Sequence, residues 1–561
     1  MEKRKNNILQ LLEERTNKYE DRIALGIRTA FGWKEFTYRG IGLLSRKLAC
    51  YLINQIGIVK GERIAMLSES KPEFGAGVFA SVLAGGVTVP LDIKLTKYEL
   101  HSILSDCLPT VIMASQTYMQ TALELQRELP CIKHIILLDE LSDKCSLPTL
   151  YSIPNNYEAK WRLRSVKATA LIIYTSGTTG SPKGVEISFE NMLTQLDDLS
   201  KLYHLFFPRI NGKGLRILSI LPMNHLFELT VGFSTMLDWG LSIYYTKSLK
   251  PKDILGIMQE KNIDFMIVVP AFLKLLKSGI ESEIRNSNKL VQIMFKLMFN
   301  FSKFVPFYSV RKMLFSKIHK KFGGKFNGCI SGGAPLDVQV GEFFERIGIR
   351  VYQGYGLTET SPVVSVNVDR RDDIASVGPV LSSFEARIDA QTGELLLKGP
   401  SIMKGYYNQP ELTAQAVDAD GWLHTGDIAD INKYGHIHIT GRIKNMIVLN
   451  GGKKVFPEEV ESVIEKSPLF SEVCVFGATR EGGAKDGTED IVAVIVPSEQ
   501  TINDASSEEE LNATVREEVK NLSNHLASYK RPINIIVRKE PLPKTTTRKI
   551  KRLEVKSMAM V

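Results

Sequence analysis

Cysteine is scarce in this sequence, and its copies are not paired. The six cysteines stand at positions 50, 107, 131, 145, 329 and 474, and none forms the C-x-x-C spacing of zinc sites and redox motifs. We therefore expect neither a zinc site nor a disulfide framework. Scattered, reduced thiols of this kind are typical of cytoplasmic proteins.

Long apolar runs are also missing. No stretch of about 18 uninterrupted apolar residues occurs, so the sequence predicts no transmembrane helix. The N-terminal segment MEKRKNNILQLLEERTNKYED is charged and lacks the apolar core of a signal peptide. We expect a cytoplasmic protein, which would reach a membrane only from the cytoplasmic side.

Acidic residues are fewer than basic ones, 62 against 71, and the net charge of +9 is modest for 561 residues. Such an excess permits attraction to anionic membranes or nucleic acid without establishing either. Because the basic residues are spread and no nucleic-acid-binding module is found, no nucleic-acid partner is expected. The length exceeds one ordinary core, so we expect at least two domains.

The most informative stretch runs from Tyr174 to Val185 and reads YTSGTTGSPKGV. It follows an apolar run at 168–173 that predicts a buried strand. Glycines allow a concave loop with exposed amides, hydroxyls add donors, and Lys183 adds a compact positive charge, so the stretch predicts a polyphosphate cradle. It does not fit the G-x-x-x-x-G-K-[ST] P-loop, which occurs nowhere in the chain. The alternative is a flexible linker, which the embedded Pro-Lys-Gly disfavours.

Strand-like and helix-like runs alternate up to about Pro400, which predicts a parallel α/β sheet with helices on its faces. After Arg442 the composition changes, and apolar strands at 473–476 and 491–497 indicate a small α+β domain. The predicted fold is therefore α/β, a large layered body followed by a small mobile α+β domain. The expected boundaries are 1–442 and 443–561.

The stretch at 174–185 closely resembles the phosphate-binding signature of the adenylate-forming superfamily, which contains acyl-CoA synthetases, luciferases and peptide-synthetase adenylation domains. Later segments continue the resemblance, and they are ISGGAPL (330–336), VYQGYGLTETSP (351–362), WLHTGDI (422–428), TGRIKNM (440–446) and PLPKTTTRKIKR (541–552). The resemblance implies ATP and Mg²⁺ as cofactors and CoA as a co-substrate.

The resemblance also assigns residues to each part of the nucleotide. It implies that Thr358 meets the α-phosphate, and that Glu359 and Thr178 hold the magnesium ion, a role that a hard carboxylate suits. A helix cap is the ordinary alternative for a Thr-Glu pair. The implied phosphate-binding residues are Thr175, Ser176, Gly177, Thr178, Thr179, Gly180 and Lys183. The implied adenine-flanking residues are Gly333, Ala334, Tyr355 and Gly356.

Three charged residues near the C-terminus complete the implied set. Asp427 and Arg442 would bind the ribose hydroxyls, a role that carboxylates suit as acceptors. By resemblance, Lys549 enters the adenylation site as a catalytic residue, and Lys444 stands at the hinge around which the small domain rotates. One departure from the family pattern precedes Lys549, because Arg548 replaces the usual glycine. A basic solvated tail is the alternative for this segment.

The segment LPMNHLFE (221–228) is a short loop leading into an apolar helical run. A lone histidine there is more often packed than catalytic, but a nearby carboxyl-activating site favours a function. In the superfamily the matching segment borders the substrate carboxylate. The resemblance therefore implies that His225 is a catalytic residue and that Phe227 lies on the acyl pocket.

The segment 286–322 combines Met, Phe, Leu and Ile with nine Lys or Arg when Arg285 is counted, and it contains no Asp or Glu. This pattern indicates amphipathic helices that lie on an anionic membrane or line a long apolar cavity. The alternative is a helical hairpin packed on the body with solvated lysines. A similar insertion is typical of long-chain acyl-CoA synthetases.

Together these features predict a two-step ligase. The segments most resemble those of bacterial long-chain acyl-CoA synthetases, so the implied substrate is a fatty acid. ATP would activate the acid to an acyl adenylate, and the acyl group would then be transferred to CoA. One alternative is an acyl carrier protein as the thiol partner. Another is a nucleotide- or lipid-binding regulator with impaired catalysis, motivated by Arg548.

Overall fold

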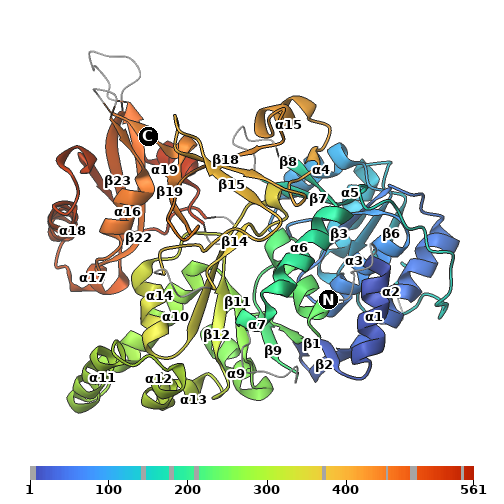
Figure 1. Ribbon diagram of the computed structural model, residues 1–561, viewed down its shortest axis with the longest axis horizontal. Coiled ribbons are helices and arrows are strands. Elements are labelled where there is room, and N and C mark those ends of the chain that lie inside the picture. Colours follow the sequence, from blue (N-terminus) through green and yellow to red (C-terminus); the bar gives the residue numbers. More distant parts are fainter. Residues whose placement is uncertain are drawn as a thin grey trace. The chain divides into compact units, whose positions relative to one another are not determined.

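The computed structural model describes residues 8–140, 147–175, 182–206, 214–368, 374–449, 453–479, 489–544 and 549–560 (Figure 1). The chain forms two compact units. The first consists of Met1–Glu385 and Lys398–Leu423, and the second of Ala386–Leu397 and His424–Val561. This division by compactness differs from the predicted boundary after Arg442. The predicted boundary is the hinge of a domain rotation, and it stays a prediction.

A seven-stranded sheet forms one layer of the first unit, in the order β17-β8-β7-β4-β3-β5-β6. From β7 to β6 all neighbours are parallel, whereas β8 runs antiparallel to both β7 and β17. The predicted strand after residue 168 is confirmed as β7. The strands are β3 (Arg63–Leu67), β4 (Val87–Pro90), β5 (Val111–Ala114), β6 (His134–Leu137), β7 (Thr169–Thr175), β8 (Lys183–Ser188) and β17 (Gly405–Tyr406).

An eight-stranded sheet forms the second layer, in the order β14-β13-β12-β11-β9-β10-β1-β2. Its six inner strands are parallel, and an antiparallel strand closes each edge. The strands are β1 (Ile23–Thr29), β2 (Gly32–Thr37), β9 (Arg216–Ser219), β10 (Ser242–Tyr245), β11 (Phe265–Val268), β12 (Gly328–Ser331), β13 (Arg350–Tyr355) and β14 (Ser365–Val366).

Helix α3 (Pro72–Leu83) lies between these sheets, and all 12 of its residues are buried. Its small residues permit the close approach. A side-chain carbon at Gly75 would come within 2.5 Å of the Phe233 ring, and one at Gly77 within 2.7 Å of Met66. The predicted α/β body is thus a layered structure with one helix enclosed by two sheets.

The remaining helices of the first unit surround these layers. They are α1 (Ile8–Tyr19), α2 (Tyr38–Tyr51), α4 (Lys97–Cys107), α5 (Met119–Glu128), α6 (Phe189–Lys201), α7 (Tyr203–Phe206), α8 (Met236–Asp238), α9 (Pro251–Lys261), α10 (Pro270–Arg285), α11 (Lys289–Ser302), α12 (Tyr308–Leu314), α13 (Ser316–Lys321), α14 (Val338–Arg346) and α15 (Pro410–Ala416). A π-helical segment, Glu228–Thr235, leads into α8. No helix in the described ranges is both long and apolar enough to cross a bilayer.

The described residues of the second unit form three sheets. One has the order β15-β16-β18-β19, the second pairs β20 with β21, and the third has the order β22-β23-β24. The strands are β15 (Glu385–Ile388), β16 (Glu394–Lys398), β18 (Leu423–Ile431), β19 (Ile437–Arg442), β20 (Ile447–Val448), β21 (Lys454–Val455), β22 (Phe470–Thr479), β23 (Glu489–Pro497) and β24 (Asn534–Val537). The helices are α16 (Pro457–Ile464), α17 (Glu499–Asp504), α18 (Glu508–Ser523) and α19 (Arg552–Ala559).

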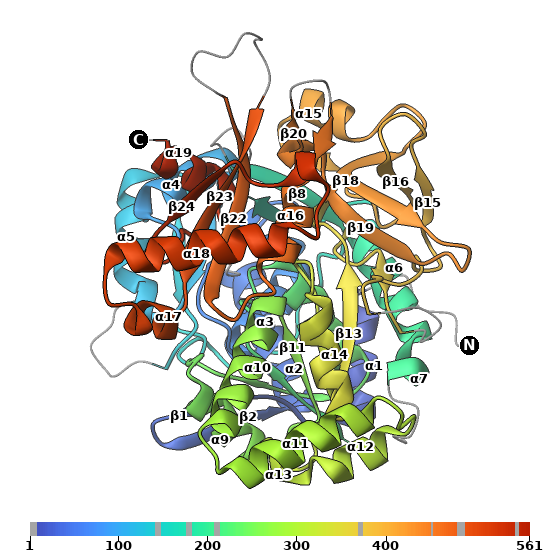
Figure 2. The ribbon, with the colours of Figure 1, turned by 90° about the vertical axis from the view of Figure 1, so that its left-hand side faces the viewer.

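Both faces of the β22–β24 sheet are covered. Val473 and Val475 belong to an apolar cluster with residues of α16 and α18, and α18 crosses in front of β22 and β23 in Figure 2. The alternate residues Cys474 and Phe476 pack on the other side with Val555 of α19. Burial on two faces explains why β22 is apolar at consecutive positions, and it confirms the strands predicted at 473–476 and 491–497.

Candidate functional site

The carboxyl ends of neighbouring parallel strands bring two predicted motifs together. Strand β12 ends at Ser331, which is paired with Gln353 of the parallel strand β13. The glycine-rich turn after β12 and the turn after β13 therefore leave the sheet at the same edge, where ligands of open α/β sheets gather. Gly333 has a φ of +80°, in the left-handed region that favours glycine. This places Gly333 and Ala334 near Tyr355 and Gly356.

A tight turn follows β13 and holds the Thr-Glu pair. A side-chain carbon at Gly356 would lie 2.0 Å from the carbonyl oxygen of Pro362, so only glycine fits. The backbone N–H of Leu357 donates to Oγ1 of Thr360 at 2.9 Å, which fixes the turn from inside. Thr358 and Glu359 remain half-buried and accessible, while Thr360 is buried.

Glu359 is joined to the phosphate-loop strands by Tyr406. The Tyr406 hydroxyl donates to Oε1 of Glu359 at 2.9 Å, and the Lys183 ammonium lies 5.4 Å from the centre of the Tyr406 ring. Burial and the Glu359 carboxylate raise the pKa of Tyr406, so its hydroxyl stays protonated and donates. The Glu359 carboxylate thus contacts the hydroxyl of Tyr406, and the Lys183 ammonium lies over the ring of the same side chain.

The structure describes the two ends of the predicted phosphate loop. Thr175, at the end of β7, pairs with Lys183, at the start of β8. The pairing of β8 with β17 sets Tyr406 opposite Val185, which explains its closeness to Lys183. Five predicted phosphate-binding residues lie outside the described residues, and they are Ser176, Gly177, Thr178, Thr179 and Gly180.

The LPMNHLFE segment is anchored at the same sheet edge. The Ser70 hydroxyl accepts from the backbone N–H of Met223 at 2.9 Å and donates to the carbonyl of Leu221 at 3.2 Å. A side-chain carbon at Gly332 would come within 2.8 Å of the Phe227 ring, so this ring packs directly on the glycine-rich turn. Burial lowers the pKa of the nearby His225 imidazole, while the negative charge of Asp92 opposes this shift.

The second unit carries the other three candidate residues, and it groups them. Asp427 is 2 % exposed and accepts from Nε of Arg442 at 2.6 Å, across the β18–β19 pair. Part of the Lys549 side chain is exposed, but desolvation by the surrounding protein lowers the pKa of its ammonium. The positive charge of Arg442 lowers it further, and Asp427 opposes both. Arg548 lies outside the described residues.

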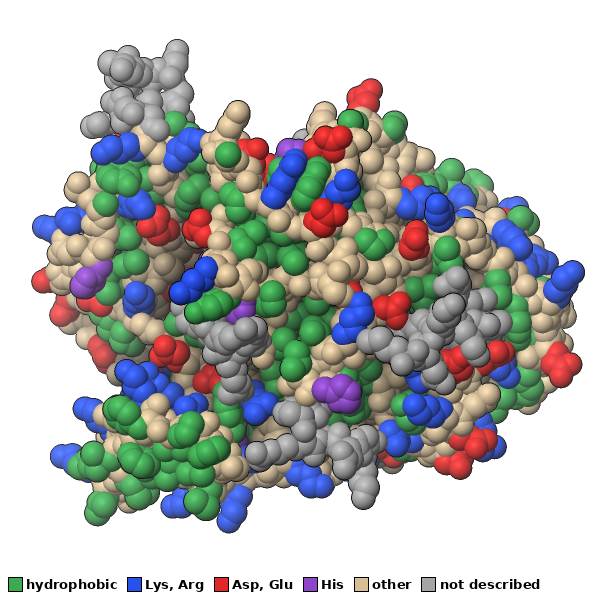
Figure 3. All heavy atoms as spheres, in the orientation of Figure 1, with side chains coloured by type: hydrophobic (Ala, Val, Ile, Leu, Met, Phe, Trp, Pro, Cys, Tyr) green, Lys and Arg blue, Asp and Glu red, His purple; other side chains and the backbone are tan. Residues whose placement is uncertain are grey.

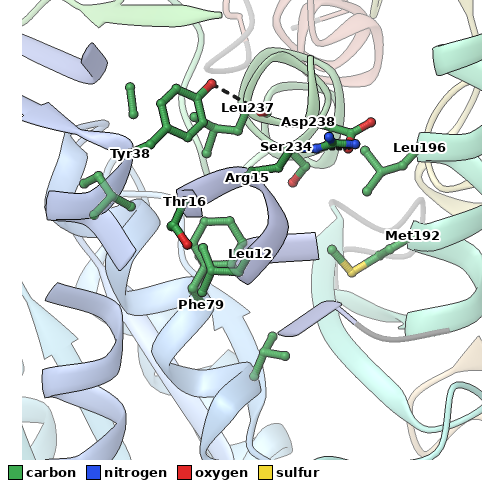
Figure 4. Close-up of a pocket in the computed structure, with 14 residues that line it drawn as sticks. Leu12, Arg15, Thr16, Tyr38, Phe79, Met192, Leu196, Ser234, Leu237 and Asp238 are labelled. Carbon is green, nitrogen blue, oxygen red and sulfur yellow. Dashed lines mark hydrogen bonds and ion pairs between the residues drawn. The ribbon is translucent and has the colours of Figure 1, made fainter. Parts of the chain in front are cut away.

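A cavity in the first unit lies away from these motifs. It is lined by residues of α1, α2, α3, α6 and the segment around α8, and the close-up in Figure 4 includes the Arg15–Asp238 ion pair of 2.9 Å. Its volume of about 40 Å³ accommodates roughly three water molecules at ~10–15 Å³ each. None of the predicted site residues lines it, and it is too small for a fatty chain.

Comparison with known proteins identifies the family. The family model described as AMP-binding enzyme matches residues 12–407, and that described as AMP-binding enzyme C-terminal domain matches residues 459–549. The chain belongs to the AMP-binding enzyme family. This membership confirms the predicted resemblance and the predicted enzyme class, an AMP-forming acid–CoA ligase.

Individual relatives cover nearly all of this AMP-binding enzyme. The long-chain-fatty-acid--CoA ligase of Salmonella typhimurium is 27 % identical over 596 aligned residues, which cover 99 % of this chain and 95 % of that one. ATP-bound MatB from Rhodopseudomonas palustris has a TM-score of 0.76 at 24 % identity, covering 98 % of both chains. O-succinylbenzoate Coenzyme A Synthetase (MenE) from Bacillus subtilis, in complex with ATP and magnesium ion, has a TM-score of 0.74 at 23 % identity, covering 97 % and 99 %. These two structures confirm the fold.

Two residues of this AMP-binding enzyme were not found from its sequence. Tyr406 lies in the stretch KGYY, far along the chain from both Glu359 and Lys183, and only the β8–β17 pairing reveals it. Glu228 ends the LPMNHLFE segment, and its position in an apolar helical run was the available signal. An acidic residue on the buried side of such a run is unusual, because a buried charge costs free energy unless it is paired or neutralised.

Glu228 is completely buried at the start of the π-helical segment. The Ser219 hydroxyl donates to its Oε1 at 2.5 Å, and among the described residues its Oε2 has no hydrogen-bond partner. Burial raises the pKa of Glu228 to about 8. The carboxyl is therefore mostly protonated at neutral pH, which avoids an unpaired buried charge.

The titration of Glu228 should appear in the pH dependence of stability. The folded chain binds this proton more tightly than the unfolded chain, so the free energy of unfolding should fall as pH rises from about 4.5 towards about 8. Glu228→Gln keeps the acceptor for Ser219 and removes the ionisation. We expect the difference in free energy of unfolding between variant and wild type to shift in favour of the variant by a few kcal/mol across this window, at about 1.4 kcal/mol per pH unit.

Urea unfolding at pH 5 and pH 8 measures this difference. The control is Glu342→Gln, which removes a surface carboxylate paired with Arg346 and should show no such trend. Parallel pH profiles for wild type and Glu228→Gln would contradict the raised pKa.

Proposed function

We propose that this AMP-binding enzyme activates a long-chain fatty acid with ATP and transfers the acyl group to CoA. The observation that carries the proposal is the meeting of Lys183, Tyr406 and Glu359 beside the turn that contains Thr358. This arrangement supplies a cation for phosphates and a carboxylate for a metal ion. The near full-length similarity to the Salmonella long-chain-fatty-acid--CoA ligase supports the choice of acid and thiol.

The first half-reaction solves a problem of charge. A carboxylate is a poor electrophile, because its charge repels nucleophiles and oxide is a bad leaving group. In the proposed step a carboxylate oxygen attacks the α-phosphorus of ATP, the bond to the bridging oxygen breaks, and pyrophosphate leaves. The protein has to hold two anions together and exclude water while this occurs.

The residues of the first unit divide this task. We assign the loop from Thr175 to Lys183 to the β- and γ-phosphates and Thr358 to the α-phosphate. Tyr355 and the 333–334 turn flank the adenine, with Gly356 allowing close backbone approach. These roles are the ones that the family resemblance implies, and they are supported by the described positions of Thr358, Tyr355 and the 333–334 turn at the sheet edge and of Thr175 and Lys183 at the base of the loop.

Magnesium fits the donor set around Glu359. Its carboxylate accepts one hydrogen bond, from Tyr406, and carboxylate oxygens have further lone pairs for a cation. No group of three or more His, Cys, Asp or Glu side chains gathers within the described ranges. A site with one carboxylate suits Mg²⁺, which takes its other ligands from phosphates and water. Glu359 would hold the ion with Thr178, and the ion would neutralise phosphate charge.

The second unit contributes the ribose and catalytic residues of the proposal. Asp427 and Arg442 are paired, and we propose that they meet the ribose hydroxyls, because carboxylate oxygens accept from hydroxyls and guanidinium N–H groups donate to them. The ammonium of Lys549 stabilises negative charge as pyrophosphate leaves. Desolvation makes such a charge more effective, although it also lowers the lysine pKa.

The second half-reaction needs a thiol at the carbon that has just been activated. The CoA sulfur attacks the acyl carbonyl, the bond to the adenylyl oxygen breaks, and AMP leaves. Because Lys549 and a pantetheine arm cannot occupy one place, we propose that the small domain rotates about Lys444 between the two steps. By the family resemblance we assign Gly451 and Gly452, which lie outside the described residues, to the proposed thiol tunnel.

The acyl pocket is assigned to the LPMNHLFE segment. His225 borders the substrate carboxylate, and its lowered pKa favours a neutral imidazole that donates a hydrogen bond without adding charge. Phe227, packed on Gly332, shapes the apolar side of the pocket. The preference for a long acyl chain is the most specific part of the proposal, and it is supported by the similarity to the Salmonella ligase.

A panel of carboxylates tests the proposed function directly. Release of AMP is measured with acetate, octanoate and palmitate, each with CoA, with an acyl carrier protein bearing phosphopantetheine, and without a thiol. We expect palmitate with CoA to give the highest kcat/KM. A preference for the carrier protein would select the alternative thiol partner, and ATP binding without pyrophosphate exchange would identify a regulator.

Lys549→Ala separates the two half-reactions. We expect adenylate formation to fall about 10²–10³-fold, since one charged donor to the transition state is lost. Thioester formation from preformed acyl adenylate should be retained. Lys551→Ala is the matched control, because Lys551 is exposed and pairs with Glu554 at 3.2 Å. An equal loss in both half-reactions would contradict the one-step role of Lys549.

Tyr406→Phe tests whether Tyr406 positions Glu359. The variant keeps the ring beneath Lys183 and removes only the donor to the carboxylate. We expect adenylation to slow by about tenfold or more, since a hydrogen bond to a charged group is worth roughly 1.5–3 kcal/mol. The Mg²⁺ concentration for half-maximal rate should also rise.

Pyrophosphate exchange at varied Mg²⁺ concentrations gives both quantities. Tyr407→Phe provides the control, because it removes a neighbouring hydroxyl that forms no hydrogen bond among the described residues. A lower rate with an unchanged Mg²⁺ dependence would assign Tyr406 to packing alone.

A further inference from the structure

Among the described residues, helix α11 packs on the body through one of its sides. Phe295 lies 5.6 Å from the Phe315 ring, and Phe299 lies 5.6 Å from the Phe343 ring of α14. The Arg346 guanidinium stacks over Phe299 at 5.1 Å. The predicted alternative of a helical hairpin packed on the body is therefore correct for this inner side.

The outer side of α11 is apolar and uncovered. Residues at spacings of three, four and seven share one side of the helix and its C-terminal extension, and they are 45–79 % exposed. We call them the α11 face, and they are Leu290, Ile293, Met294, Leu297, Phe301 and Phe304. A surface helix of a globular protein normally turns its polar side outwards, so this arrangement is reversed.

The α11 face and its apolar neighbours together expose more area than an ordinary surface patch. At about 150–250 Å² for a whole large side chain, these residues and the neighbouring Phe307 and Met313 expose on the order of 1,000 Å². The largest apolar patch of a typical monomer covers roughly 300–600 Å². Figure 3 shows these side chains at the lower left, gathered over α11 and α12 with Lys and Arg around them.

Lysines border the α11 face in a regular row. Lys289, Lys296 and Lys303 recur every seven residues, so they follow one line along the helix next to the apolar stripe. All three are exposed, and among the described residues none forms a salt bridge. Lys317 and Lys320 of α13 add exposed positive charge, and no acidic residue occurs between 286 and 322.

These charges decide between two occupants of the face. A symmetric contact with a second copy of the chain would gather the positive charge of two 286–322 segments at one interface, with no acidic residue in either segment to offset it. An anionic bilayer surface instead offers acyl chains to the apolar stripe and phosphates to the lysines. Long lysine side chains can reach the phosphates while their stems lie along the apolar boundary.

We propose that the α11 face docks this protein on an anionic lipid bilayer. The helix lies in the interface plane, with its six apolar side chains among the acyl chains and the lysine row at the phosphates. The proposal concerns the first unit alone and does not depend on catalysis. It also provides a place where a fatty acid dissolved in the bilayer meets the enzyme.

Vesicle binding of the full chain tests the proposal. Co-sedimentation is measured with phosphatidylcholine vesicles and with vesicles that contain phosphatidylglycerol as well. We expect strong binding to the anionic vesicles, and a decrease as salt is added. Replacement of Ile293, Leu297, Phe301 and Phe304 by Ser should weaken it on the order of 100-fold, because apolar area drives interfacial binding.

The lysine row is tested separately. Each lysine near an anionic surface strengthens binding about fivefold, so changing Lys289, Lys296 and Lys303 to Gln should weaken it on the order of 100-fold on anionic vesicles only. Two control variants carry equal numbers of substitutions outside 286–322. They are Phe31, Val59, Tyr98 and Leu205 to Ser, and Lys133, Lys160 and Lys167 to Gln, all at exposed positions.

Both controls should bind as the wild type does, and unchanged thermal unfolding shows that each variant is folded. Absence of vesicle binding by the wild type would overturn the proposal, as would equal losses in the control variants. So would sedimentation velocity in which the serine variant changes a dimer to a monomer while its vesicle binding stays the same.

Discussion

The hydrogen bond from Tyr406 to Glu359 joins the two sheets of the first unit at the place where chemistry is proposed. Tyr406 belongs to the seven-stranded sheet, and Glu359 follows the last parallel strand of the eight-stranded sheet. The backbone N–H of Met403 adds a second link, to the carbonyl of Glu359 at 2.8 Å. Tyr406 thereby contacts both Glu359, the proposed metal ligand, and Lys183, the proposed phosphate-binding lysine. Without this link, each would depend on a different sheet for its position.

Buried charge is treated differently in the two units. In the first unit Glu228 has a single hydroxyl donor, and its raised pKa keeps it neutral. In the second unit Asp427 is almost as deeply buried, but the guanidinium of Arg442 pairs with it across two strands. A buried carboxylate stays ionised only where a cation or several donors compensate for the lost water. Arg442 supplies this compensation for Asp427, whereas Glu228 has one hydroxyl donor among the described residues.

The apolar residues of α11 divide into a covered group and an exposed group. The aromatic rings of Phe295 and Phe299 are used for packing, as in any globular core. The equally apolar residues on the opposite side of α11 find no cover among the described residues, and the lysines beside them find no acidic partner. One helix thus has two apolar sides with different partners, the protein on one side and, as proposed, lipid on the other.

Much of this protein was determined by local sequence. Glycine, hydroxyl and charge patterns identified the motifs and the family, because a phosphate-binding turn needs specific backbone freedom at specific positions, as at Gly333 and Gly356. The alternation of strand-like and helix-like runs predicted the α/β layers, because the apolar run of a buried strand can be recognised in the local sequence. Tyr406 and Glu228 could not be predicted in this way. Their roles arise from tertiary packing. The pairing of β17 with β8 sets Tyr406 near Lys183, and the Tyr406 hydroxyl reaches Glu359. The fold also turns Glu228 back onto Ser219, which lies nine residues earlier in the chain.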